Sequence, residues 1–343
     1  MAKINGMEVN EAVLDEMERT KWQRTGKTLL KDWRLYALLV PLLLFMLLFK
    51  YLPIKGILVA FKYNDSTKDA LNMDWYGVYN LKASLFSDAT FWRAFRNTFV
   101  NSMYGLFLGF PIPILLALEF SEIKNYGYRS VLQVCSYLPK FLSTVITTTI
   151  ITIWCKHVTS GTGTDMKGIL TIIFENFGWI TKSEAGKYTV EGGILYQARF
   201  FRPVYQISGI WEASGYGSIV YFAAILAISP SSYEAARIDG ASKLQQIRYV
   251  TLPGMAPTLS IMLIMRIGQV LNIGYEKVLL LYTTNSYETA DVVSTYIARK
   301  RASGTDVDVS VGIGADLMNS LIAMALVLGA NAISRKVSDT SLF

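Results

Sequence analysis

The chain has 343 residues, of which 52% are hydrophobic and only 17% are charged, and its mean hydropathy is +0.32. A soluble domain carries about 25% charged residues, so this composition favours a membrane protein over a soluble enzyme. The net charge of +7 suits anionic lipid at a membrane surface. Basic residues are not interleaved with aromatic ones, so nucleic acid is not an expected partner. Two cysteines and one histidine offer no disulfide framework and no metal-ligand spacing, and we expect no cofactor.

Residues 1–34 are polar, and basic side chains gather just before the first apolar run, at Lys21, Arg24, Lys27, Lys31 and Arg34. No small-residue cleavage site follows that run, so a cleavable signal peptide is not indicated. We expect a cytoplasmic tail with a short surface helix over residues 9–19. The basic cluster and Arg335-Lys336 favour both termini inside, although the total of Lys and Arg in the inner and outer loops does not decide the orientation.

Six apolar segments are long enough to cross about 30 Å of hydrocarbon as helices. They lie near residues 35–52, 97–118, 131–154, 205–228, 257–281 and 310–333. The first can continue to Phe61, across an interruption by Pro53 and Gly56. Gly105 and Gly109 have the G-x-x-x-G spacing that permits close helix contact, and the prolines at 111 and 113 predict a kink. The expected fold class is therefore all-α, a polytopic membrane protein with six transmembrane helices.

The loops expected outside the membrane are long, at residues 62–96 and 155–204. The second contains an amphipathic run, Ile169–Ile180, and a glycine-containing turn at 191–193 that weakly indicates a hairpin. The single histidine, His157, has neither metal-ligand neighbours nor a nucleophile beside it, so we expect an interfacial residue.

A polar, punctuated stretch at residues 229–256 separates two long apolar segments. An S-x-x-E capping box at 231–234 predicts the start of a helix, and Gly240 predicts its end. A second box, S-x-x-Q at 242–245, predicts another helix, which Pro253 should stop. The pattern indicates two short helices joined by a glycine turn.

The same stretch resembles the EAA loop in permease subunits of binding-protein-dependent ATP-binding-cassette (ABC) importers. The matching residues are Glu234, Ala235, Ala236, Asp239, Gly240, Ala241, Leu252 and Pro253. Leu244 and Ile247 stand where the family commonly has Trp and Phe, and both remain apolar. The resemblance implies a coupling helix at 229–256 that docks in a cleft of an ATP-hydrolysing subunit, with Leu244 and Ile247 among the contacts.

More of the chain resembles permeases for oligosaccharides and polysaccharide fragments, including alginate importers. The matching segments are FKYLPIKGILVAF, FWRAFRNTF, FRPVYQISGIWEASGYGSIVY, LNIGYEKVLLLY, YETADVVSTY and ISRKVSDTSLF. The resemblance covers residues 35–343. It implies a first helix with its extension at 35–61, an extracytoplasmic loop at 62–96, a permease core at 97–335 and a cytoplasmic tail at 336–343. It also implies the bacterial inner membrane, a second permease subunit, two ATPase subunits, an extracytoplasmic solute-binding protein and alternating access.

The fifth apolar segment carries polar side chains on one arc of the expected helix, namely Arg266, Gln269, Asn272, Glu276 and Lys277. A charged side chain facing lipid costs about 3 kcal/mol at mid-membrane, so this arc should face a partner or water. One interpretation is the wall of a translocation pathway. The other is structural pairing, for example of Arg266 with Glu212 or of Glu276 with Lys277.

Two aromatic residues near the fourth segment, Trp211 and Tyr216, could stack on sugar rings or pack at an interface. The guanidinium of Arg266 suits carboxylates, so uronate-containing oligosaccharides are candidate substrates, although neutral sugars also accept its hydrogen bonds. With Glu212, these residues complete the candidate pathway.

Other classes of protein are less well supported. The sequence contains no phosphate-binding G-x-x-x-x-G-K-[ST] motif, so we expect a transport subunit whose ATP hydrolysis is carried by other chains. A secondary transporter would usually show inverted repeats, which are not visible. A membrane-embedded enzyme would need a convergent cluster of His, Cys or carboxylate side chains. An ABC permease for a different solute remains the alternative within the family.

Overall fold

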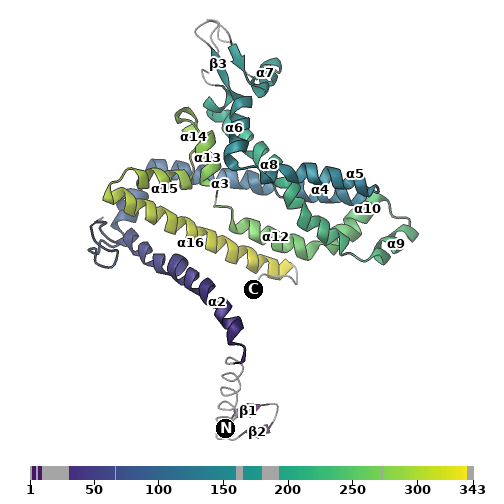
Figure 1. Ribbon diagram of the computed structural model, residues 1–343, viewed down its shortest axis with the longest axis horizontal. Helices are drawn as coiled ribbons and strands as arrows, with labels where there is room; N and C mark the ends of the chain where they lie inside the picture. Colours follow the sequence, from purple (N-terminus) through teal and green to yellow (C-terminus); the bar gives the residue numbers. More distant parts are fainter. Residues whose placement is uncertain are drawn as a thin grey trace.

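The computed structural model describes residues 2–4, 7–9, 31–65, 67–159, 165–179, 193–271 and 273–337, and it is almost entirely helical (Figure 1). Two short antiparallel pairs are the strands of this part: β1 (Ala2–Ile4) with β2 (Met7–Val9), and β3 (His157–Thr159) with β4 (Asp165–Lys167). Three helices are long and apolar enough to cross a membrane, or six spans if each bent pair of helices counts as one. The all-α expectation is confirmed.

The first span is continuous from Trp33 to Phe61. It consists of α2 (Trp33–Met46), a π-helical turn (Leu47–Tyr51) and a 3₁₀ helix (Leu52–Phe61). The extension to Phe61 is therefore confirmed, with Pro53 tolerated near the start of the 3₁₀ segment, where its missing N–H costs little. In the most apolar part of this span, no residue is buried by the described part of the chain.

The second span begins earlier than expected, because Asp88 caps the helix by accepting a hydrogen bond from the N–H of Thr90 at 2.8 Å. Helix α3 (Ala89–Phe107) ends shortly before Pro111, and α4 (Pro111–Glu122) starts at that proline. The helix is thus interrupted before the prolines, although both parts together count as one span. Both G-x-x-x-G glycines lie at this junction.

Two spans expected as single helices are broken. Helix α5 (Tyr126–Tyr137) runs into a 3₁₀ turn (Leu138–Phe141) that contains Pro139, and α6 (Thr144–Cys155) then leaves, so that the two parts of the pair lie at 96°. Helix α12 (Ala256–Gly268) is separated from α13 (Tyr275–Leu281) by a non-helical segment. The prediction of one helix over 257–281 is wrong. The placing of its polar side chains on one arc of a single helix is therefore wrong as well.

The remaining elements complete the bundle. Helix α8 (Ala198–Leu226) is unbroken and follows a short 3₁₀ turn (Ile194–Tyr196). After α13 come a 3₁₀ turn (Thr284–Ser286), α14 (Tyr287–Ala290), α15 (Val293–Ala302) and α16 (Asp306–Val337). In Figure 1, α15 and the start of α16 lie at one end of the bundle, and α9 and α10 lie at the other.

The expectations for the long loops have mixed outcomes. The amphipathic run forms α7 (Ile169–Asn176), shorter than predicted. A hairpin that was not expected occurs at 157–167. Residues 191 and 192 lie outside the described residues, and so does nearly all of the helix expected at 9–19, whose first residue is in β2.

The stretch at 229–256 folds into α9 (Pro230–Ile238), α10 (Lys243–Gln246), a π-helical turn (Ile247–Thr251) and α11 (Leu252–Gly254). The second capping box is confirmed, since the N–H of Ser242 donates to Oε1 of Gln245 at 2.7 Å. The first is wrong: α9 starts at Pro230, whose fixed φ suits a first helical position. Pro253 does not stop the second helix, because the wider π turn ahead of it lets the chain continue to Gly254.

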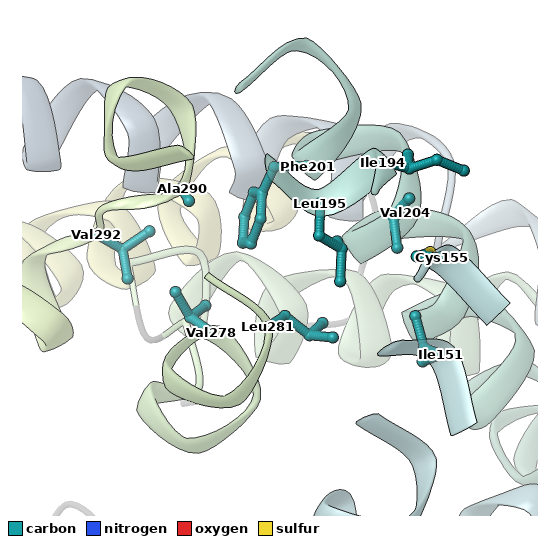
Figure 2. Close-up of a cluster of buried hydrophobic side chains, with 10 residues drawn as sticks. All are labelled: Ile151, Cys155, Ile194, Leu195, Phe201, Val204, Val278, Leu281, Ala290 and Val292. Carbon is teal, nitrogen blue, oxygen red and sulfur yellow. The ribbon is translucent and has the colours of Figure 1, made fainter. Parts of the chain in front are cut away.

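A hydrophobic cluster fixes α6, α8 and α13 to one another (Figure 2). Its members are Ile151, Cys155, Ile194, Leu195, Phe201, Val204, Val278, Leu281, Ala290 and Val292. The second half of each broken span is thereby anchored on the unbroken α8.

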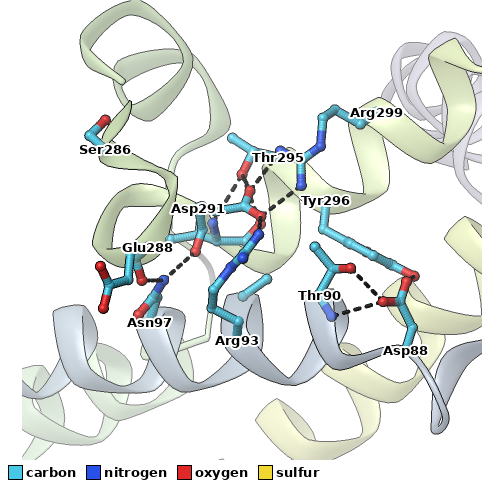
Figure 3. A network of polar contacts seen from close by, with 12 residues as sticks. Asp88, Thr90, Arg93, Asn97, Ser286, Glu288, Asp291, Thr295, Tyr296 and Arg299 are labelled. Carbon is cyan, nitrogen blue, oxygen red and sulfur yellow. Dashed lines mark hydrogen bonds and ion pairs between the residues drawn. The ribbon is translucent and has the colours of Figure 1, made fainter. Parts of the chain in front are cut away.

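A polar network joins α3 to the segment that holds α14 and α15 (Figure 3). Asp291, whose side chain is 0% exposed, accepts two hydrogen bonds from Arg299 at 2.7 and 2.6 Å. The amide of Asn97 donates to the backbone oxygens of Glu288 and Asp291 at 2.9 and 3.0 Å. The Asp291 hydrogen bonds raise the pKa of the Arg299 guanidinium against the opposing effect of burial.

We expect the Asp291→Asn variant to lower the melting temperature of the protein. The change leaves Arg299 without its bidentate partner, and breaking a buried ion pair costs about 3–5 kcal/mol, with the lower end expected because Arg299 is partly exposed. The control is Asp69→Asn, which removes an exposed ion pair with Lys55 and should cost at most about 1 kcal/mol. Thermal unfolding of both purified variants compares them, and equal shifts would contradict a structural role for Asp291.

Candidate functional site

The candidate site is a cavity of about 440 Å³ between α3, α4, α8, α12 and the break before α13. Its wall contains amides and a hydroxyl from Asn101, Ser102, Gln206 and Gln269, and aromatic rings from Phe110, Tyr205, Tyr216 and Tyr221. Broken helices at membrane depth are tolerated where they line such a cavity, because the freed backbone groups then have polar neighbours. The cavity is therefore a place where polar solute can meet this part of the bundle.

Three cationic side chains line the cavity: Lys140 from the turn between α5 and α6, Arg266 from α12 and Lys277 from α13. Among its described lining residues there is no aspartate or glutamate. Several positive charges that face one concave space attract anions. The wall is thus suited to solutes that carry carboxylates or many hydrogen-bond acceptors.

Arg266 lies against the glycine pair of the second span. One guanidinium nitrogen, Nη2, donates to the backbone oxygen of Gly105 at 3.3 Å. A Cβ atom added at Gly109 would come within 3.3 Å of the same nitrogen and 2.5 Å of the Gly105 oxygen. The G-x-x-x-G spacing therefore makes room for a guanidinium. Pairing of Arg266 with Glu212, one of the alternatives from the sequence, is wrong.

Glu212 pairs instead with Lys277, at 2.9 Å between Oε2 and Nζ, and the two side chains are only 15% and 12% exposed. Its other oxygen, Oε1, lies 4.0 Å from Nζ of Lys140. Glu276, the partner suggested for Lys277 by sequence, is exposed. Lys277 therefore belongs to the cavity wall, and its charge is balanced from α8.

Of the other expected pathway residues, some line the cavity and some do not. Gln269 and Tyr216 line the cavity, with the Tyr216 ring edge-on to Phe141 at 6.0 Å between centroids. Trp211 is exposed and is not part of the wall. Asn272 lies outside the described residues.

Sequence reasoning missed Lys140, Asn101 and Gln206. Lys140 follows Pro139 in the middle of an apolar segment. This Pro-Lys sequence was the available signal both for a break in the helix and for a charged residue in the cavity wall. Asn101 is 2% exposed, and neither its amide nitrogen nor its amide oxygen has a hydrogen-bond partner in the structure. Its backbone oxygen accepts a hydrogen bond from Nε2 of Gln206 at 2.7 Å, which holds α3 against α8.

The stretch at 229–256 forms a second candidate site, at the end of the bundle. Gly240 has φ +75°, as its turn requires, and a hydrogen bond of 3.0 Å between the hydroxyls of Tyr233 and Thr251 holds the two helices together. Glu234, Ala235, Asp239, Gly240 and Leu244 are exposed, and Ala236, Ala241 and Ile247 are half-buried.

Large apolar side chains on this surface are left open. Leu244 is 77% exposed, and Ile238, which sequence reasoning did not single out, is 86% exposed. Lys243 bonds to Glu122 of α4 at 2.6 Å, so the loop is fixed to the bundle. A rigidly held loop that presents apolar side chains is suited to contact another protein.

Comparison with known proteins gives consistent matches. At 30% identity over 97% of both chains, the sequence resembles the polygalacturonan/rhamnogalacturonan transport system permease protein YteP of Bacillus subtilis. It is also 31% identical to Protein LplB of the same species, over 91% of this chain and 92% of that one.

The structure is similar to a crystal structure of a bacterial ABC transporter involved in the import of the acidic polysaccharide alginate, with a TM-score of 0.78 and 36% identity. A second match, with a TM-score of 0.77 and 35% identity, is the bacterial alginate ABC transporter in complex with an alginate pentasaccharide-bound periplasmic protein. Each covers 92% of this chain and 99% of the other.

Residues 109–337 match the family model of the binding-protein-dependent transport system inner membrane component. The expected resemblance to permease subunits of ABC importers is thereby confirmed. The chain belongs to the family of inner membrane components of binding-protein-dependent transport systems.

Proposed function

We propose that this chain is the permease subunit of an ABC importer that moves oligosaccharides, including uronate-containing ones, across a bacterial inner membrane. The observation that carries the proposal is the cavity with three cationic side chains and several amide and phenol groups. Sugar hydroxyls can bond to the amides and phenols, and uronate carboxylates can bond to the cations. The names of the similar permeases and transporters, which concern acidic polysaccharides and their fragments, support the same substrate class.

The chain supplies a conduit, and partner chains supply the energy. We expect a second permease, two ATPase subunits and an extracytoplasmic solute-binding protein to complete the transporter. Closure of the ATPases on ATP moves the loop at 229–256, and that movement changes which end of the cavity is open. The spans built from α5 and α6 and from α12 and α13 are the elements whose parts can tilt about their breaks, while α8 is one continuous helix.

Contacts between loops support the topology expected from sequence. Glu122, at the end of α4, bonds to Lys243 of the stretch at 229–256, so these two segments lie on the same side. At the other end, Asn64 of the 62–96 loop donates to Asp306 at 3.2 Å, and Tyr296 donates to Asp88 at 2.9 Å. We therefore propose that 1–34, 229–256 and 336–343 are cytoplasmic, and that 62–96 is extracytoplasmic.

The substrate proposal is tested by Arg266→Gln in the full complex, reconstituted in liposomes with its binding protein. Loss of one charge-assisted hydrogen bond is worth about 1.5–3 kcal/mol, so uptake of a uronate oligosaccharide at low concentration should fall about 10- to 100-fold. Basal ATP hydrolysis and subunit content should persist. The control is Arg301→Gln, which removes an exposed arginine whose ion pair with Asp316 is 3.5 Å long. Normal uptake by a stable Arg266→Gln complex would remove this residue from the pathway.

The coupling proposal is tested by Leu244→Glu. The side chain is exposed in this chain, so the fold should be kept, while a charge facing an apolar cleft should release the ATPase during purification through this subunit. Gly240→Pro should have the same effect by a different route, because proline cannot adopt φ +75°. The matched control is Leu71→Glu, an exposed leucine of the 62–96 loop. Retention of ATPase and of transport by both coupling-loop variants would contradict the docking role.

A further inference from the structure

One face of α8 holds the ammonium group of Lys277 in a fixed place. Tyr205, Gly209 and Glu212 follow this face at spacings of three and four residues. Nζ of Lys277 lies 2.9 Å from the Glu212 carboxylate and 5.7 Å from the centre of the Tyr205 ring. A Cβ atom added at Gly209 would lie 3.8 Å from the same nitrogen. Lys277 is thus balanced by one carboxylate and packed over one aromatic face.

The same carboxylate serves a second lysine. Nζ of Lys140 lies 4.0 Å from Oε1 of Glu212, and its side chain is 46% exposed, so this contact is longer and more open than that with Lys277. Lys140 comes from the turn between α5 and α6, and Lys277 comes from α13, beyond the break after α12. Glu212 therefore bridges cations from two different broken spans, from its place on the unbroken helix.

The charges of the cavity do not cancel. Lys140, Arg266 and Lys277 line it, and Glu212 is the carboxylate in ion-pair contact with any of them among the described residues. Two positive charges therefore remain in excess in a confined space. A uronate carboxylate is the same chemical group as the Glu212 side chain, so it can take over the same ammonium donors.

We infer that Glu212, which is not a lining residue but pairs with two lining lysines, is a built-in competitor for the carboxylate of an acidic sugar, and so a residue that determines the specificity of the cavity. An entering uronate displaces Glu212 from Lys140, the weaker contact, and shares Lys277 with it. A neutral sugar carries no carboxylate, so it cannot replace Glu212 as the ion-pair partner of either lysine. The competition lowers the affinity for uronates enough for release, and it leaves the affinity for neutral sugars nearly unchanged. This inference rests on the proposed function.

The test measures direct binding of trigalacturonate, and of its fully methyl-esterified form, to the purified complex without the binding protein. The ester has the same size but no carboxylate. With Glu212→Gln, the apparent Kd for trigalacturonate should fall at least fivefold, because the competitor is gone and two lysines are unbalanced. With Lys277→Gln, the Kd should rise at least tenfold. Binding of the ester should change less than twofold in both variants.

The matched control is Glu276→Gln, which removes the same charge from the next position to Lys277, on the exposed side of α13 and outside the cavity. It should leave the binding of both sugars unchanged. The double variant Glu212→Gln with Lys277→Gln removes the pair together. It keeps the site free of an unpaired buried charge, so it should assemble and should discriminate less between acid and ester than the wild type.

Two results would overturn the inference. The first is a Glu212→Gln complex that binds the acid more weakly, or whose Kd values for acid and ester change by the same factor. The second is a double variant that discriminates between acid and ester as the wild type does. The second result decides if Glu212→Gln alone does not assemble. Uptake into liposomes, measured with the binding protein, separates this failure from that of the proposed function. If the wild type imports neither sugar, the proposed function falls and this inference with it. If it imports the acid but Glu212→Gln binds unchanged, only the inference falls.

Discussion

A polar group inside this bundle must find its partner within protein, because the surrounding hydrocarbon offers none. The arrangement of the spans follows from that constraint. Breaks in the α5–α6 and α12–α13 pairs would be costly against lipid, and they face the cavity, where Arg266, Lys140 and Lys277 also point. The freed backbone groups at the breaks and the charged side chains occur in the same place because both need polar partners, and each kind of group provides such partners for the other.

Helix α8 is the element against which this arrangement is built. It carries Glu212, which balances lysines from both broken spans, and it takes part in the cluster around Phe201 that anchors α6 and α13. Its glycines allow close approach: a Cβ atom added at Gly215 would collide with the backbone oxygen of Ser136 in α5. The cavity is thus built from one unbroken helix and two broken ones.

Much of the fold could be predicted from sequence because long apolar runs and glycine or proline punctuation are local signals. The extension to Phe61, the break before Pro111 and the turn at Gly240 all belong to this kind. The breaks within the third and fifth spans could not be located, because apolarity continues through them and only Pro139 and the glycines at 268 and 274 mark them.

The candidate site was predicted in part for the same reason. A charged residue in an apolar run indicates that the residue has a polar partner, so Arg266 and Glu212 could be predicted as candidate site residues. Which partner each has depends on helix bends and on contacts far apart in sequence. Glu212 was therefore matched with the wrong cation, and Lys140 was overlooked. The residues of the stretch at 229–256 were easier to predict, because the motif that they form is contiguous in the sequence.

The first helix, α2, stands apart from this network, and that separation bears on the order in which the protein is made. Residues 35–49 contain no ionisable group except one tyrosine, and no side chain of α2 is buried by the rest of the chain. This helix can therefore enter the bilayer during synthesis on its apolarity alone. The halves that carry Arg266, Lys140 and Lys277 have no such independence, because their polar partners belong to α3 and α8. Lys140 in particular precedes its partner Glu212 in the chain, so its charge is balanced only after α8 has been made. The first helix can thus insert independently, whereas the later helices with charged residues depend on one another for stable insertion.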